Sequence, residues 1–341
     1  MTDNSSLSRP AAISLRTVFR GIGQVMFQQS AWTGLLFLAG IFWGSYQNGC
    51  PQVAWGAITG AIAATVAGIL MGSNARQADG EAGLWGFNGT LVGCAFPTFL
   101  GNNWMMWICL VLCAMTTTWV RKGFNNVMAP WKVNSLTFPF VFMTWMFLFA
   151  ARYFPGLDPV GLSTPEITIP DPGTLATGFD DLVVYWLKGI SQVFLIDSWV
   201  TGIFFLVALF VCSRWAALWA ALASAISLAI ALVFHGDPHT VASGLFGFSP
   251  VLTGIAVGCT FYKVTWRSAL WTLIAVITTV FIQAAMDTMM LPYGMPTLTA
   301  PFCITTWLFL LPRNTLDNRP IPDHSLWVRD IDSQRQNDKN L

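Results

Sequence analysis

Two similar stretches decide the fold of this chain: GIGQVMFQQSAWTGLLFLAGIF, residues 21–42, and GISQVFLIDSWVTGIFFLVALF, residues 189–210. The second stretch follows the first at an offset of 168 residues. Self-similarity at a fixed distance indicates that one structural unit is used twice. We therefore expect the chain to fold as two related halves.

Two further pairs of blocks occur in the same order in both halves. GLWGFNGTLVG, residues 83–93, matches GLFGFSPVLTG, residues 244–254. NSLTFPFVFMTWMFLF, residues 134–149, matches PTLTAPFCITTWLFLL, residues 296–311. The repeat therefore extends over almost the whole length of each half.

The composition indicates a membrane protein. Of the 341 residues, 55% are hydrophobic and only 10% are charged, whereas an ordinary soluble domain carries about 25% charged residues. The 17 Lys and Arg nearly balance the 16 Asp and Glu, which gives no sign of a nucleic-acid-binding surface. Soluble enzymes and DNA-binding proteins are therefore set aside.

Ten windows are apolar enough to cross a bilayer, which needs about 20 residues per helix. They are 31–46, 53–72, 84–100, 103–120, 136–153, 199–213, 215–234, 244–262, 265–287 and 298–312. The apolar segments 16–29 and 182–197 are too short to cross, and each contains a basic residue, Arg20 or Lys188. We expect these two segments to form half-helices.

Each half then holds one half-helix and five spans, and because five is odd the second copy enters the membrane from the opposite side. The expected fold is an all-α polytopic membrane protein, with ten transmembrane helices and two re-entrant pore half-helices in an inverted repeat of two five-helix halves. Its parts are an N-terminal tail (1–15), a first repeat (16–153), a connecting loop (154–181), a second repeat (182–312) and a C-terminal tail (313–341).

Basic residues orient the chain, because Lys and Arg concentrate in cytoplasmic loops. Both tails are expected in the cytoplasm and the connecting loop outside it, and no signal peptide is expected to be removed. The loops then expected to face inward hold Arg76, Arg121, Lys122, Lys132, Arg214, Lys263 and Arg267. Only Arg152 and Lys188 fall on the outer side.

Interruptions recur at matched places in the two halves. They are Gly83, Gly86, Gly89, Gly93 and Pro139 in the first half, and Gly244, Gly247, Pro250, Gly254 and Pro301 in the second. Broken helices are tolerated in a membrane where they line a cavity or are buried in protein, and inverted repeats place a solute pathway between such helices. The alternative is that Gly permits close helix packing and Pro kinks a span.

The spans are nearly free of ionisable groups, which favours a neutral solute that moves down its gradient. Asp287 is the only acidic residue in the ten windows, and Asp197 ends the second half-helix. The three His residues lie in loops or the tail, and the seven Cys lack metal-ligand spacing. No metal or cofactor is expected, and no nucleophile with its base points to an enzyme.

Polar and aromatic residues come in pairs related by the repeat. Gln24 pairs with Gln192 and Thr137 with Thr299, while Phe87 and Leu91 pair with Phe248 and Leu252. Amide and hydroxyl groups can replace water on a small solute that has both N–H and C=O functions. The alternatives are hydrogen bonds between helices and ordinary core packing.

The blocks GIGQVMFQ and GISQVFLI, GFNGTLVG and GFSPVLTG, and SLTFPF and TLTAPF resemble the urea transporter family, especially its short bacterial members. The resemblance implies a passive urea pathway in each protomer of a homotrimer in the bacterial inner membrane. It also implies flanking solute sites and a central site. The flanking sites would involve Gln24, Val25, Phe27, Phe87, Leu91, Gln192, Val193, Phe248 and Leu252, and the centre Thr137 and Thr299.

Two departures from symmetry stand out: Leu195 replaces the counterpart of Phe27, and Ser249-Pro250 replaces Asn88-Gly89. The alternative functions are a channel for other small neutral solutes, such as short amides, ammonia or water, and an ion-coupled small-solute transporter. A glycerol channel would carry twin NPA boxes, which the sequence lacks.

Overall fold

The computed structural model describes residues 14–71, 75–166 and 173–312, and every regular element within them is a helix. The predicted tails lie outside these ranges, apart from Ser14 and Leu15. Four helices are long and apolar enough to cross a membrane: Gln52–Leu70, Trp104–Trp131, Arg214–Val233 and Trp266–Tyr293. Phe179–Phe194 and Trp199–Cys212 form a further apolar pair with a bend of 71° between them. The all-helical membrane architecture expected from the sequence is confirmed at this level.

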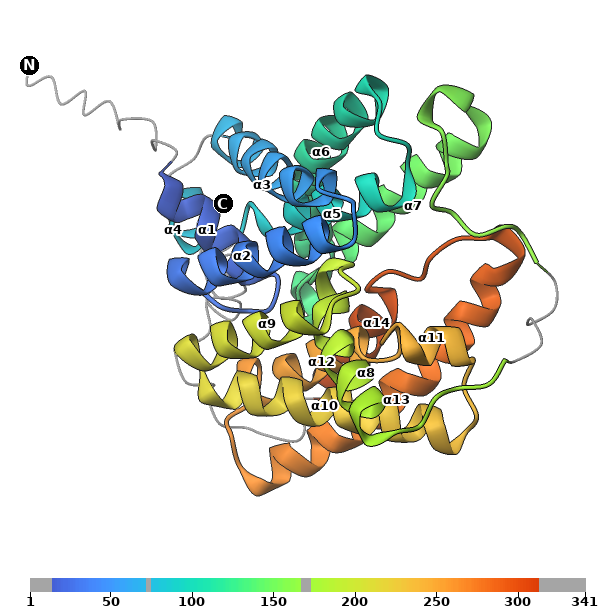
Figure 1. The fold of residues 1–341 in the computed structure, drawn as a ribbon. Helices are drawn as coiled ribbons and strands as arrows, with labels where there is room; N and C mark the ends of the chain where they lie inside the picture. Colours follow the sequence, from blue (N-terminus) through green and yellow to red (C-terminus); the bar gives the residue numbers. More distant parts are fainter. Residues whose placement is uncertain (1–13, 72–74, 167–172, 313–341) are drawn as a thin grey trace, which may run out of the picture.

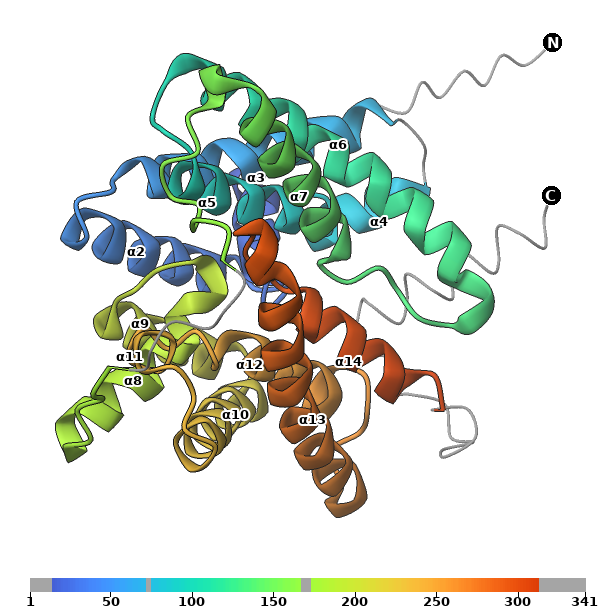
Figure 2. The same ribbon diagram turned by 90° about the vertical axis from the view of Figure 1, so that its right-hand side faces the viewer.

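The helices follow one another in the same order in both halves (Figure 1). The first half contains α1 (Leu15–Gln24), α2 (Ala31–Gln47), α3 (Gln52–Leu70), α4 (Ala75–Ala82), α5 (Phe87–Phe99), α6 (Trp104–Met128), η1 (Ala129–Trp131), α7 (Phe138–Tyr153) and η2 (Pro155–Leu157). The second contains α8 (Phe179–Ser191), η3 (Gln192–Phe194), α9 (Trp199–Cys212), α10 (Arg214–Val233), α11 (Pro238–Ala242), α12 (Phe248–Ile255), η4 (Ala256–Thr260), α13 (Trp266–Met290), η5 (Leu291–Tyr293) and α14 (Ala300–Leu310). Figures 1 and 2 show the helices of each half gathered together.

A helix lies in each of the ten predicted windows, but α6 and α13 extend beyond theirs. Helix α6 continues to Met128, so Arg121 and Lys122 lie on a helix and not in the predicted loop. Hydropathy marks only the apolar part of a helix, whereas backbone hydrogen bonding continues past the first charged residue. The prediction of a loop at these two residues was therefore wrong.

Pro139 and Pro301 lie in the first turns of α7 and α14 and do not kink a span. The first turn of a helix suits proline, because its fixed φ is helical and its missing N–H would have no intrahelical partner there. These prolines therefore mark where two helices begin inside the protein.

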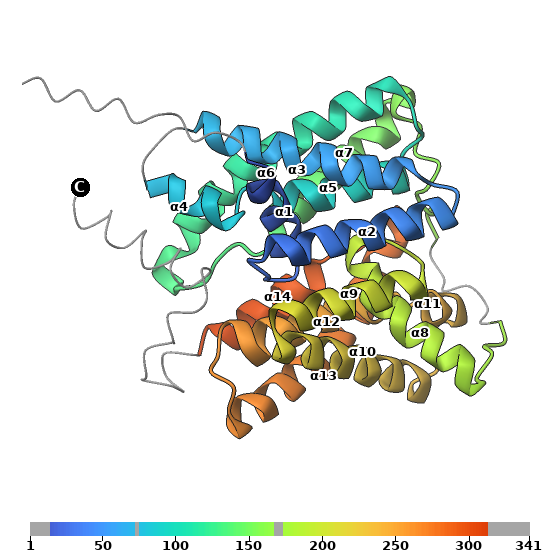
Figure 3. The same cartoon turned by 60° about the vertical axis from the view of Figure 1, so that its left-hand side comes forward.

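Two equivalent hydrogen bonds join the halves through α2 and α9, which lie side by side (Figure 3). Thr33 Oγ1 on α2 donates to the carbonyl of Ala208 on α9 at 3.1 Å. Thr201 Oγ1 on α9 donates to the carbonyl of Gly40 on α2 at 2.8 Å. Both donors and both acceptors are related by the repeat offset of 168 residues. The two helices are therefore antiparallel and related by a local two-fold axis.

Thr33→Val and Thr201→Val are expected to lower the free energy of unfolding equally, by about 0.6 kcal/mol each, because each removes one buried bond between helices. Unfolding measured in lipid bicelles would check this, and the double variant should show the sum of the two losses. A loss confined to one of the two single variants would contradict the two-fold relation.

Helices α3 and α5 cross with their backbones in contact. A Cβ atom added at Gly60 would overlap the carbonyl oxygen of Gly89, and one at Gly93 would overlap that of Gly56. This glycine crossing, formed by Gly56, Gly60, Gly89 and Gly93, is the close packing that small residues permit between membrane helices. It fixes α5, which carries Phe87 and Leu91.

Candidate functional site

The helices α1 and α8 both stop inside the protein at a left-handed residue. Phe27 follows α1 with φ 63°, and Leu195 follows η3 with φ 58°. This conformation is unfavourable for side chains such as Phe and Leu, and it persists only where the surroundings enforce it. Ser30 and Ser198 then cap the next helices, accepting from the backbone N–H groups of Thr33 and Thr201. Helices α1 and α8 therefore end at equivalent positions of the two halves.

Gln24 and Gln192 occupy equivalent buried positions at these ends. Gln24 Nε2 donates to the carbonyl of Ala82 at 2.9 Å, and Gln192 Nε2 donates to that of Ser243 at 2.8 Å. Each accepting carbonyl precedes a glycine with positive φ, Gly83 at 84° or Gly244 at 72°. The glutamines therefore connect the ends of α1 and α8 to the breaks before α5 and α12. Val25 and Val193, the next residues along, are buried beside them.

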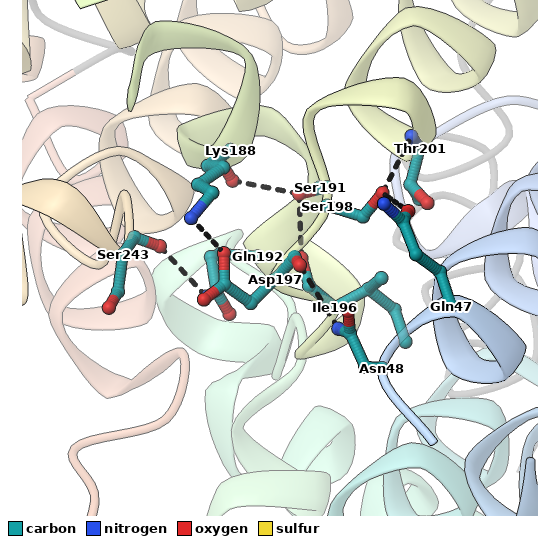
Figure 4. Close-up of polar contacts among 10 residues, drawn as sticks. All are labelled: Gln47, Asn48, Lys188, Ser191, Gln192, Ile196, Asp197, Ser198, Thr201 and Ser243. Carbon is teal, nitrogen blue, oxygen red and sulfur yellow. Dashed lines mark hydrogen bonds and ion pairs between the residues drawn. The ribbon is translucent and has the colours of Figure 1, made fainter. Parts of the chain in front are cut away.

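The turn after α8 is fastened to both halves (Figure 4). Lys188 Nζ lies 2.7 Å from Asp197 Oδ1. Asn48 Nδ2 of the first half donates to the backbone carbonyl of Asp197 at 3.0 Å, and Ser198 Oγ donates to Gln47 Oε1 at 2.9 Å. The turn that carries Gln192 and Leu195 is thereby held against the end of α2.

Both basic residues predicted on the outer side have partners. Lys188 is paired with Asp197, and both side chains are only partly exposed, at 22% and 44%. Arg152 Nη2 donates to the carbonyls of Ser163 at 2.7 Å and Gly294 at 3.0 Å. Each of these two cations is therefore held by polar groups of the protein.

The two threonines predicted at the centre are brought together. Thr137 Oγ1 and Thr299 Oγ1 lie 2.6 Å apart and form a hydrogen bond. Their residues are 2% and 3% exposed. Cys303 Sγ lies 3.3 Å from Thr137 Oγ1, whereas the equivalent residue in the first half is Val141. A pair of buried hydroxyls thus joins the starts of α7 and α14.

A second pair of equivalent bonds flanks the threonines. Trp145 Nε1 donates to the carbonyl of Pro296, and Trp307 Nε1 donates to that of Asn134, both at 2.8 Å. Sequence reasoning did not single out these tryptophans, although both stand at matched positions in the third pair of blocks. They fix α7 and α14, which Figure 2 brings forward, on either side of the local two-fold axis.

The aromatic candidates are not arranged alike in the two halves, and Phe27 is only partly buried. Phe87 and Leu91 lie one turn apart on α5, as Phe248 and Leu252 do on α12, and all four are buried. Phe27 packs edge-on against Phe261 at 5.8 Å and Phe302 at 6.0 Å between ring centroids, both in the second half. Its counterpart Leu195 has no ring, so the asymmetry expected from the sequence is present at this pair.

Sequence reasoning also missed two residues beside Phe87. Asn88 Oδ1 accepts from the backbone N–H of Phe140 at 3.2 Å, in the first turn of α7. Arg121, expected in a loop, is 3% exposed, and its guanidinium carbon lies 5.9 Å from the Phe87 ring centroid. The helix-length error described above is the reason why Arg121 was not a candidate.

Comparison with known proteins decides the family. A family model described as urea transporter matches residues 15–314, which include every candidate residue above. The chain belongs to the urea transporter family. Urea transporter 1 from Ovis aries is 32% identical over 302 residues, which cover 86% of this chain and 76% of that protein. Urea transporter 1 from Capra hircus is 31% identical over 302 residues, and that from Mus musculus is 29% identical over 297, with the same shares covered. The resemblance noted in the sequence is confirmed.

Proposed function

We propose that this protein carries out passive, channel-like facilitated transport of urea across a membrane. Family membership supports the substrate, since its relatives are named as urea transporters. The observation that carries the mechanism is the contact of Thr137 with Thr299, two buried neutral hydroxyls that meet where the halves join. The pathway runs along this junction.

The central pair acts by exchanging partners. A hydroxyl can both donate and accept, so a urea molecule that separates Thr137 from Thr299 replaces one Thr–Thr bond with a bond to each side chain. Urea supplies N–H donors and a C=O acceptor in one plane, which suits two groups facing each other. The solute is thus hydrogen-bonded at the point where it has lost its water.

The flanking zones hold urea by its faces and edges. Phe27, Phe87 and Phe248 lie against the faces of the planar solute, while the amides of Gln24 and Gln192 contribute polar contacts. Backbone carbonyls at the ends of α1 and α8 accept from urea N–H groups, and the negative end of each helix dipole favours these donors. Val25, Val193, Leu91 and Leu252 complete the lining. Several weak sites in series allow entry and exit without trapping.

The layout that serves this pathway is an inverted repeat, residues 16–153 and 182–312, with ten spans and two re-entrant half-helices. Support comes from the reciprocal bonds of α2 with α9 and of Trp145 with Trp307. We further propose a homotrimer with one pore per protomer, in the bacterial inner membrane, with both tails cytoplasmic and residues 154–181 outside. The protein is not an enzyme and takes no cofactor.

Flux into proteoliposomes tests the proposal. Stopped-flow shrinking and reswelling with urea, acetamide, glycerol and ammonia should show fast urea entry, and urea should equilibrate to the outside concentration. Collapse of the proton and sodium gradients should leave that level unchanged. Accumulation above the outside concentration would point to an ion-coupled transporter. If the protein speeds the entry of glycerol or ammonia over that into protein-free liposomes more than it speeds the entry of urea, a channel for other neutral solutes would be favoured.

A further inference from the structure

A positive charge lies buried next to the proposed pathway in the first half. Arg121 stands on α6, one of the helices long enough to span a membrane, and its side chain is 4% exposed. Arg121 Nη1 lies 3.5 Å from Asp79 Oδ2, and the Asp79 side chain is 20% exposed. A charged residue inside a membrane segment is costly, and such residues are usually functional. This arginine therefore needs an explanation beyond folding.

The guanidinium of Arg121 is directed at one of the pathway aromatics. Its central carbon lies 5.9 Å from the centroid of the Phe87 ring, which is within range of a cation–π interaction. Aromatic faces attract cations in general, so a slot lined by phenyl rings attracts cationic solutes as well as urea. Because the Phe87 ring already interacts with the Arg121 guanidinium, its attraction for a second cation is weaker.

The second half has no charged residue at the equivalent positions. Its residues at the positions of Arg121 and Asp79 are the neutral Gln283 and Thr240, although Phe248 matches Phe87. Gln283 lies on α13 and Phe248 on α12, the counterparts of α6 and α5. Since the same helices pack in the second half without a charge at this position, packing alone does not require the arginine. The charge therefore has a role that is specific to the Phe87 side of the pathway.

We propose that Arg121 is a specificity-determining residue, which excludes cationic solutes from the Phe87 side of the pathway. The inference rests on the proposed function. The solute class that it rejects is the planar cation of the size and shape of urea, of which guanidinium is the simplest member. A cation stacked on Phe87 would lie on the order of 9 Å from the guanidinium, and repulsion at an effective dielectric of about 20 disfavours it roughly twentyfold, a factor that the neighbouring Asp79 carboxylate reduces toward tenfold. Neutral urea is not repelled.

The test compares guanidinium with urea in the same proteoliposomes. Guanidinium stays charged at pH 7, like the arginine side chain that it matches. Wild-type protein should pass urea and pass guanidinium at least about tenfold more slowly. Arg121→Met and Arg121→Gln should raise the guanidinium-to-urea flux ratio about tenfold, while Arg121→Lys, which keeps the charge, should leave the ratio low. Asp79→Asn should not raise it.

Acetamide separates charge exclusion from a merely supporting role of the side chain. If Arg121 only supports the ring, the Met, Gln and Lys variants change urea, acetamide and guanidinium flux together, and an unchanged guanidinium-to-urea ratio overturns the inference. Should the Met variant fail to fold, the Gln variant, which can still donate to Asp79, gives the ratio. Absence of urea flux in the wild type would instead overturn the proposed function.

Discussion

Urea flux through a Thr137→Val, Thr299→Val double variant is expected to fall about tenfold. Valine keeps the size of threonine and removes both hydroxyls that lie 2.6 Å apart at the junction of the halves. Urea then crosses the junction with its polar groups unpaired, at a cost of about 1 to 3 kcal/mol per group, and about 1.4 kcal/mol is a factor of ten in rate. Stopped-flow urea flux per reconstituted protein measures the change.

Each single variant should slow urea less than the double variant does. Removing one hydroxyl also removes the Thr–Thr bond that urea must displace, so part of the loss is offset. Thr278→Val is the matched control, because Thr278 on α13 is partly exposed and its hydroxyl donates to the carbonyl of Ile274 one turn back. If the double variant passes urea as fast as the wild type, the role assigned to the threonines is wrong.

Gly60→Ala is expected to have the largest effect on stability. Its Cβ would overlap the carbonyl oxygen of Gly89, which is backbone and cannot move aside without separating α3 from α5. Overpacking of this kind costs about 1 to 3 kcal/mol. The fraction of protein that stays monodisperse on size-exclusion chromatography after heating in detergent should therefore fall at a lower temperature than for the wild type.

Gly123→Ala is the control for this experiment. Gly123 lies on α6, and apart from the backbone of its own helix no atom lies within 4 Å of an added Cβ. Alanine is the better helix former, so this variant should match or exceed the wild type in heat resistance. Equal heat resistance of the Gly60 and Gly123 variants would show that α3 and α5 do not need their close contact.

The features best predicted from the sequence are the residues that occur in both repeats, because the same residue type at matched positions rarely arises twice without a structural reason. Thr137 with Thr299 and Gln24 with Gln192 could be chosen from the matched blocks, and the breaks at Gly83 and Gly244 have the positive φ that only such a break requires. A single exposed glycine or threonine would have carried no such information.

What the sequence could not predict are the contacts that particular side chains make with one another. Nothing in the spacing indicates that the two threonines bond to each other, that Cys303 lies beside Thr137, or that Phe27 packs against Phe261. Arg121 was misplaced for a different reason: the rule that assigns arginine to cytoplasmic loops takes no account of a helix that continues past the apolar window.

The reciprocal bonds between α2 and α9 bear on how the protein is made. The ribosome completes residues 31–47 long before residues 199–212. The Thr33 hydroxyl and the Gly40 carbonyl are therefore made before the α9 residues with which they form hydrogen bonds. Neither half can reach its final packing before the other has been inserted. A nascent chain that ends between them therefore has the polar groups of α2 in the bilayer without their partners on α9.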